Sequence, residues 1–179
     1  MTKVFIAGSR KLSRLSSEVK TRIETMIEKG FTILVGDANG ADKAVQRYLA
    51  EKGYRDVIVH CMAANCRNNV GDWPTREITA PKGVRGFAYY AMKDQAMVDD
   101  ADYGLMLWDC ESKGTLNSVI NMIRQGKAVV VYLAPKRAFQ NLRSADDVTH
   151  LLSQCDRASV QRFERELGID QALHRASPS

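Results

Sequence analysis

The sequence predicts an α/β protein with a doubly wound, mostly parallel sheet of about five strands. Five short apolar segments have the composition of strands that are covered on both faces, at residues 3–8, 31–36, 57–61, 103–108 and 128–133. Helical patterns alternate with them, at residues 15–28, 41–51, 87–100 and 115–125. This alternation is typical of βαβ units and predicts a Rossmann-like arrangement.

Each predicted helix carries apolar residues at helical spacing. The first one, for example, places Val19, Ile23 and Met26 on one face. Three glycines stand where helix C-caps belong, just before the next strand: Gly30, Gly53 and Gly126. The ends of these helices are therefore marked in the sequence as clearly as their buried faces.

Two regions break the alternation. Residues 62–86 form a connection that is long for a compact domain, and they mix aromatic and basic groups. They are interpreted either as a lid over a ligand or as a solvated loop with Trp73 packed onto the surface. Helical patterns follow at residues 145–155 and 158–167. We expect one domain at residues 1–134, containing the loop or lid, and a helical C-terminal extension at residues 135–179.

The composition is that of an ordinary globular protein. The chain has 179 residues, of which 45% are hydrophobic and 26% charged. No apolar stretch approaches the length of a membrane span, and the N-terminus lacks the pattern of a signal peptide. We therefore expect a cytoplasmic protein without a membrane partner.

The charge and the cysteines exclude some partners. The net charge is +5, but acidic residues interleave with the basic ones, which favours small anionic ligands over nucleic acid. The four cysteines are spread out without a CxxC pair, and no zinc-ligand spacing is present. We expect free thiols, no metal site and no cofactor.

Ligands of such sheets bind beyond the carboxyl ends of the strands, so the segments after the strands matter most. After the first strand comes "GSR", where Gly8 allows close approach and Ser9 and Arg10 can bind a phosphate. The alternative is a tight strand exit with an exposed arginine.

The second such segment, "GDANGAD" at residues 36–42, is rich in glycine. Gly36 and Gly40 permit close approach and positive φ, and Asp37 can hold a ribose hydroxyl. It matches neither a Walker loop nor the dinucleotide GxGxxG pattern. The alternative reading of its acidic residues is helix capping.

The segment "DCESKGT" at residues 109–115 follows the fourth strand and carries the strongest signal. Amides at Gly114 and Thr115 open a helix, whose N-terminus attracts anions, and Ser112 and Lys113 add donors. An ordinary βα loop with a capping hydroxyl is the alternative.

Carboxylates flank the same segment. Asp109 and Glu111 would repel a phosphate placed too close to them, so they suit sugar hydroxyls or acid–base work better.

Four motifs in this order resemble the SLOG superfamily over roughly the first 134 residues, and they are most similar to its uncharacterised YspA-like branch. These motifs are "IAGSR", "GDANGAD", "KDQAM" at residues 93–97 running into Ala101–Asp102, and "KGT" at residues 113–115. The resemblance implies a nucleotide pocket and a homodimer. LOG-type members cleave the N-glycosidic bond of nucleoside monophosphates.

The sequence departs from the LOG pattern at three places, one of which is the "ESK" run at residues 111–113 in place of a doubled glycine. Lys93 stands where these enzymes carry an arginine, and it keeps the charge without the bidentate fork. Ser118 stands where they carry the catalytic glutamate, and a hydroxyl cannot act as a carboxylate. Lys93 and Ser118 both remain candidates for ligand binding.

Three functional hypotheses follow. In the first, the protein binds a nucleotide or nucleotide-derived ligand as a sensor, without turnover. In the second, it is an N-glycosidase in which Asp109, Glu111 or Asp37 replaces the missing glutamate. The third, a nucleic-acid-binding module, depends on charge alone.

Overall fold

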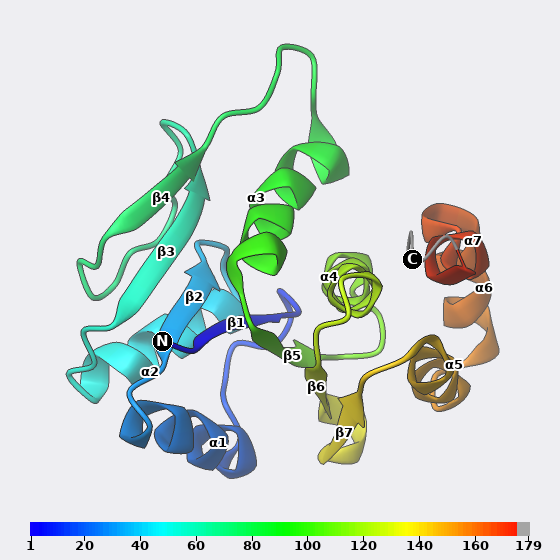
Figure 1. Cartoon of the computed structure of the whole chain (residues 1–179), viewed down its shortest axis with the longest axis horizontal. Helices are drawn as coiled ribbons and strands as arrows, with labels where there is room; N and C mark the ends of the chain where they lie inside the picture. Colours follow the sequence, from blue (N-terminus) through cyan, green and yellow to red (C-terminus); the bar gives the residue numbers. More distant parts are fainter. Residues whose placement is uncertain (175–179) are drawn as a thin grey trace.

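The computed structural model describes residues 1–174, which contain one seven-stranded sheet flanked by helices (Figure 1). The strands are β1 (Lys3–Gly8), β2 (Thr32–Gly36), β3 (Val57–Met62), β4 (Thr75–Ile78), β5 (Tyr103–Trp108), β6 (Val129–Leu133) and β7 (Ala138–Leu142). The helices are α1 (Ser17–Glu28), α2 (Ala41–Glu51), α3 (Gly86–Asp100), α4 (Lys113–Arg124), α5 (Ala145–Ser153), α6 (Arg157–Leu167) and α7 (Ile169–His174). A short 3₁₀ turn, η1 (Ala134–Lys136), joins β6 to β7.

The predicted α/β class with a mostly parallel sheet is confirmed, but the expected number of about five strands was too low. The strand order is β4-β3-β2-β1-β5-β6-β7, and only the β6–β7 pair is antiparallel. The additional strands, β4 and β7, are the two edges of the sheet. β4 lies inside the long connection, and β7 lies in the segment expected to be helical. An edge strand needs no continuous apolar run, so their polar sequences gave no strand signal.

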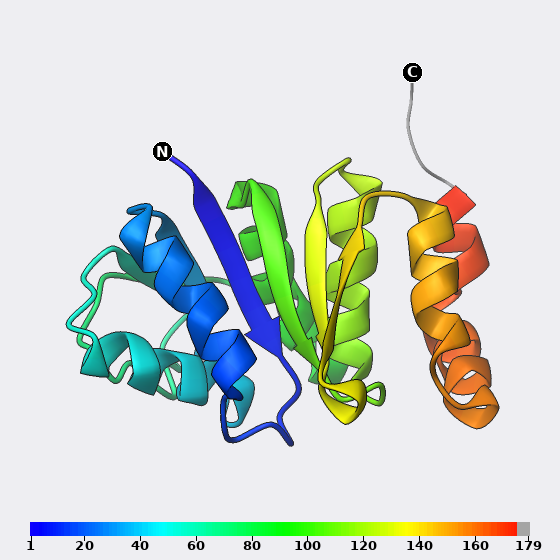
Figure 2. The same cartoon turned by 90° about the horizontal axis from the view of Figure 1, so that it is seen from below.

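Helices cover both faces of this sheet (Figure 2). α1 and α2 pack on one face, and alternate strand residues such as Val4 and Ile6 point toward them. α3 and α4 pack on the other face, with Phe5 and Leu34. The C-terminal helices lie beside α4, and α5 also contacts β7.

The order of the strands creates a switch point beside β1. The chain builds β1 to β4 in one direction across the sheet and then returns through α3 to place β5 on the other side of β1. The connections after β1 and β5 therefore diverge, which opens a crevice at their carboxyl ends. Ligands of doubly wound sheets bind at this place.

The first half of the long connection is a packed segment. Trp73 is only 3% exposed, and its indole nitrogen donates to the Tyr54 carbonyl at 2.8 Å. The Asn69 side chain accepts from the Trp73 amide at 3.0 Å and donates to its carbonyl at 2.8 Å. Gln46 of α2 accepts from the Val70 amide at 2.9 Å. These bonds favour the packed alternative for Trp73 over a lid.

Within residues 1–174, none of the helices has the length and apolar composition that crossing a membrane requires.

Candidate functional site

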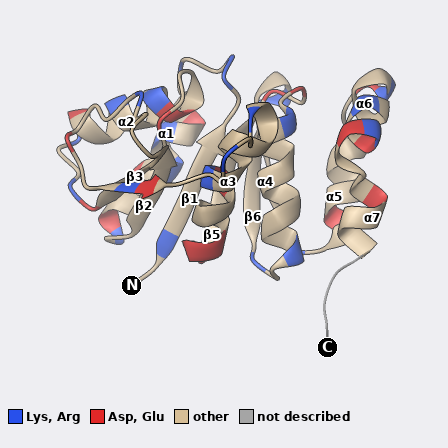
Figure 3. Ribbon diagram, turned by 90° about the horizontal axis from the view of Figure 1, so that it is seen from above, with Lys and Arg blue, Asp and Glu red and all other residues tan. Residues whose placement is uncertain are grey.

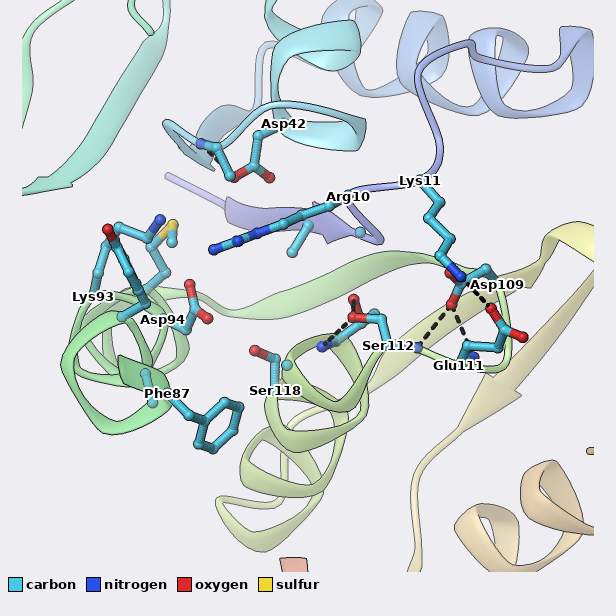
Figure 4. A pocket seen from close by; sticks show the side chains of 18 of the residues that line it. Arg10, Lys11, Asp42, Phe87, Lys93, Asp94, Asp109, Glu111, Ser112 and Ser118 are labelled. Carbon is cyan, nitrogen blue, oxygen red and sulfur yellow. Dashed lines mark hydrogen bonds and ion pairs between the residues drawn. The ribbon is translucent and has the colours of Figure 1, made fainter. Parts of the chain in front are cut away.

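A cavity of about 840 Å³ lies at the switch point, within the size range of small-molecule sites (Figure 4). β1 and the loop after it, the start of α2, α3, the β5–α4 loop, α4 and α6 all contribute to its wall. Seven of the predicted ligand-binding residues line it: Gly8, Arg10, Lys93, Ser112, Gly114, Thr115 and Ser118. The motifs that the sequence spreads over more than 100 residues therefore meet in one place.

Two other predicted binding residues hold the loops around the cavity in position. The Ser9 side chain is fully buried, donates to the Leu107 carbonyl at 3.5 Å and accepts from the Asp109 amide at 3.1 Å. Gly40 has a φ of +85°, and any side chain there would collide with the Arg10 backbone. Both residues bring the loops after β1, β2 and β5 together, and neither lines the cavity.

Asp37 lies beneath the cavity in a buried ion cluster. Its carboxylate is 3.0 Å from the Lys93 ammonium and 2.8 Å from the Arg67 guanidinium, and it also accepts from the Arg67 amide at 2.9 Å. Burial opposes its charge, but these cations outweigh burial and lower the pKa of Asp37 to about 2. Asp37 therefore orients two cations and does not face the cavity itself.

The carboxylates of the β5–α4 loop line the cavity but are already engaged. Asp109 accepts from the amides of Glu111 and Ser112 at 2.9 and 2.8 Å, which folds the loop into a tight turn. Glu111 forms an ion pair with Lys11 at 2.9 Å, and these two side chains are 55% and 77% exposed. The first carboxylate shapes the loop, and the second belongs to the solvent-exposed entrance.

The N-terminus of α4 opens onto the cavity. Ser112 caps the helix by accepting from the Thr115 amide at 3.3 Å. The amides of Lys113 and Gly114 belong to the first turn and have no partner inside the helix. Apart from its chain neighbours and the backbone of its own helix, no heavy atom lies within 4 Å of the place where a side chain at Gly114 would begin. This turn therefore presents unpaired donors and free space to an anion.

The Lys113 side chain lies at the edge of the cavity, against Phe87, which lines it. Its ammonium lies 4.2 Å from the centre of the Phe87 ring, at the start of α3. It also lies 4.0 Å from the Glu166 carboxylate of α6.

Arg10 is a cation that reaches into the cavity from the loop after β1 (Figure 4). Its guanidinium lies 5.6 Å from the centre of the Tyr90 ring, and Arg67 lies 4.6 Å from the same ring. Within residues 1–174, Arg10 makes no ion pair. It is therefore available to a negatively charged ligand.

Two cavity carboxylates were missed by sequence reasoning. Asp42, in the first turn of α2, is 8% exposed and accepts from the Ala38 amide at 3.2 Å. Burial raises its pKa to about 6, although the Lys93 charge acts in the other direction. Gly36 leaves room for it, since a side chain there would begin 2.5 Å from the Asp42 carboxylate. The sequence suggested only a helix-capping role for Asp42.

The second missed carboxylate is Asp94 of α3. It lies on the cavity wall together with Asp42 (Figure 4), and burial raises its pKa as well. The helical spacing offered a signal, because Asp94 follows Tyr90 by four positions and shares its face. Carboxyl groups whose pKa values move toward neutrality are suited to acid–base chemistry.

The C-terminal extension also reaches the cavity. Arg162 of α6 lines it and donates to the Glu111 carbonyl at 2.7 Å. Nothing in the local sequence indicated this role, because it depends on how α6 packs. The Phe163 ring lies 5.8 Å from that of Trp108 at the end of β5, which holds α6 near the loop.

In residues 1–174, no three His, Cys, Asp or Glu side chains are arranged to hold a metal ion.

Comparison with known proteins gives a likeness in fold. No protein-family model and no curated protein matches the chain. Among solved structures, it is similar to DNA processing protein A from Helicobacter pylori, with 16% sequence identity and a TM-score of 0.54. The match covers 98% of this chain and 82% of that one. That structure is described for its single-stranded DNA binding mode. At this identity, the likeness supports the Rossmann-like fold.

Proposed function

We propose that the cavity binds a nucleotide or nucleotide-derived ligand, with a phosphate at the first turn of α4. One observation carries this proposal: the Arg10 guanidinium, which makes no ion pair within residues 1–174, and the open amides of α4 face the same cavity at the switch point. Tyr90 supplies an aromatic face in the same wall. The meeting of "GSR", "KDQAM" and "KGT" here supports placing the chain among SLOG proteins.

Binding without turnover is the first form of this proposal. Ser118, at the position of the LOG glutamate, provides a hydroxyl that lines the cavity and no carboxylate. Asp37 is engaged in its buried ion cluster, and Asp109 in the turn that it folds. The residues that the sequence offered as replacements therefore support a sensor better than an enzyme.

Hydrolysis of an N-glycosidic bond is a second candidate, because Asp42 and Asp94 face the cavity with raised pKa values. A protonated carboxyl can protonate the leaving base, and an ionised one can activate water or stabilise the oxocarbenium-like centre. In this form of the proposal, Asp42 of α2 and Asp94 of α3 take the role of the missing glutamate.

The experiment is a panel of nucleoside monophosphates incubated with the purified protein. Equilibrium dialysis measures binding, and chromatography measures free base. Retention without release supports the sensor. Release that is lost in Asp94→Asn but kept in Asp99→Asn, an exposed neighbour on the same helix, supports the enzyme. Absence of mononucleotide binding contradicts both forms.

A single-stranded oligonucleotide belongs in the same panel, because the structural neighbour is described as binding single-stranded DNA. Phosphate-backbone binding weakens steeply with salt. Salt-sensitive binding of the oligonucleotide, together with no binding of any mononucleotide, would favour the nucleic-acid-binding alternative.

A further inference from the structure

Two cations lie beside the first turn of α4, on the side of α6. Arg162 lines the cavity, and Lys113 lies at the beginning of α4 against the Phe87 ring. Their side chains are 36% and 29% exposed. They are separate from Arg10, which enters the cavity from the loop after β1 (Figure 4).

A carboxylate already lies between these two cations. Glu166 of α6 is 3.5 Å from the Arg162 guanidinium and 4.0 Å from the Lys113 ammonium. Figure 3 shows basic and acidic residues together on this helix. Neither contact is a hydrogen bond, and an ion pair this exposed contributes little to stability. Glu166 therefore marks a position where negative charge is favoured, and it holds that position weakly.

The guanidinium of Arg162 has capacity for a further anion. Arginine carries five N–H donors. Within residues 1–174, the Arg162 guanidinium donates one hydrogen bond, to the Glu111 carbonyl. That bond fixes the guanidinium beside the loop and leaves other donors free. Such a planar fork matches phosphate oxygens better than an ammonium does.

A second polar group of α4 also faces the cavity and is free to bind a ligand. Ser118 is 2% exposed, lines the cavity and points into it (Figure 4). Its hydroxyl makes no hydrogen bond within residues 1–174. The Ser118 oxygen is open to the cavity, so a ligand that reaches α4 can hydrogen-bond to it in place of water.

We propose that Arg162 and Lys113 form a second anion subsite, so that the preferred ligand is a nucleotide with two linked phosphates, such as a nucleoside diphosphate. This inference rests on the proposed nucleotide site. The first phosphate binds the α4 amides and Arg10. The second replaces Glu166 between the two cations, which makes the C-terminal extension part of the binding site.

Isothermal titration of the whole protein with a nucleoside monophosphate and the matching diphosphate tests this proposal. One charge-assisted subsite predicts roughly tenfold tighter binding of the diphosphate. Arg162→Ala should remove that difference between the two ligands. Arg165→Ala, on the exposed face of the same helix, is the matched control and should keep it.

A second variant should strengthen diphosphate binding instead of weakening it, and it keeps both cations. Glu166→Gln takes away the competing carboxylate and should tighten diphosphate binding by a few-fold, with the monophosphate unchanged. Equal affinity for the two ligands in the unmodified protein, or diphosphate binding unaffected by both variants, overturns the second subsite while the nucleotide site stands. Failure to bind either ligand overturns the proposed function and this inference together.

Discussion

Ion pairs lie both at the inner end of the cavity and at its rim, and they have different roles at the two places. At the inner end, Asp37 and Lys93 are 1% and 3% exposed. At the rim, Lys11 and Glu111 are 77% and 55% exposed, and Glu166 makes only long contacts. Charges buried in this way are fixed, because separating them leaves an unpaired charge in the interior. Exposed pairs cost little to break, so a ligand can replace one partner. The inner end therefore builds the site, and the rim is where ligands exchange.

Breaking the inner ion cluster should have the largest effect. Asp37→Asn leaves Lys93 buried without its counter-charge, so we expect the free energy of unfolding to fall by about 3–5 kcal/mol. Urea unfolding at pH 7 measures it, with the exposed Glu28→Gln as control. Adding Lys93→Met should recover part of the loss, because the uncompensated charge is then gone. An Asp37→Asn protein as stable as the parent would show that the cluster is not a buried anchor.

The same cluster predicts that the free energy of unfolding decreases at acidic pH. The pKa of Asp37 falls from 3.8 to about 2 on folding, so its contribution is present above pH 3.8 and lost as the pH falls through 2. That contribution is about 2 kcal/mol. Comparing the unfolding free energies of the parent and Asp37→Asn between pH 5 and pH 2 measures it. A difference that does not narrow on acidification contradicts the assignment.

The contribution of Asp42 to stability should depend on pH in the opposite direction to that of Asp37. Its pKa rises from 3.8 to about 6 on folding, so its contribution is present below pH 3.8 and lost as the pH rises through 6. Asp42→Asn should therefore be more stable than the parent at pH 8, by up to about 3 kcal/mol, and the gain should vanish near pH 3.5. Unfolding curves at both pH values test this. Destabilisation of equal size at both values would mean that the carboxyl is not strained by burial.

Removing an ion pair at the rim should have the smallest effect on the free energy of unfolding. Lys11→Ala removes an exposed ion pair with Glu111, so we expect the urea midpoint to stay within experimental error. If Lys11 attracts the phosphate of the ligand, affinity should fall a few-fold at low salt and less at high salt. Titration at two salt concentrations checks this. A large loss of stability would remove the distinction between the rim and the inner end.

The sequence could predict the central strands, because Val4, Phe5 and Ile6 are apolar on both faces. It could also place the loop motifs at the carboxyl ends of the strands. It could not reveal β4, where Thr75, Arg76 and Glu77 are exposed at the edge of the sheet. An edge strand is determined by its neighbour in the sheet more than by its own composition.

The partners of the site residues were harder to predict than the residues themselves. Asp37 was singled out, but Arg67 and Lys93 come to it from 30 and 56 positions away. Asp94 stands next to Lys93 in the sequence, yet its raised pKa arises from burial that only the packing of α3 produces. Arg162 reaches the cavity through the packing of α6. The homodimer expected from the resemblance stays a prediction.

The most direct test of the nucleotide site compares a nucleoside monophosphate with its unphosphorylated nucleoside by isothermal titration. A phosphate held by Arg10 and the α4 amides predicts at least roughly tenfold tighter binding of the monophosphate. Arg10→Ala should remove this preference, whereas Arg14→Ala, exposed outside the cavity, should keep it. Equal affinities for nucleoside and monophosphate, or a preference that survives Arg10→Ala, would contradict phosphate binding at this place.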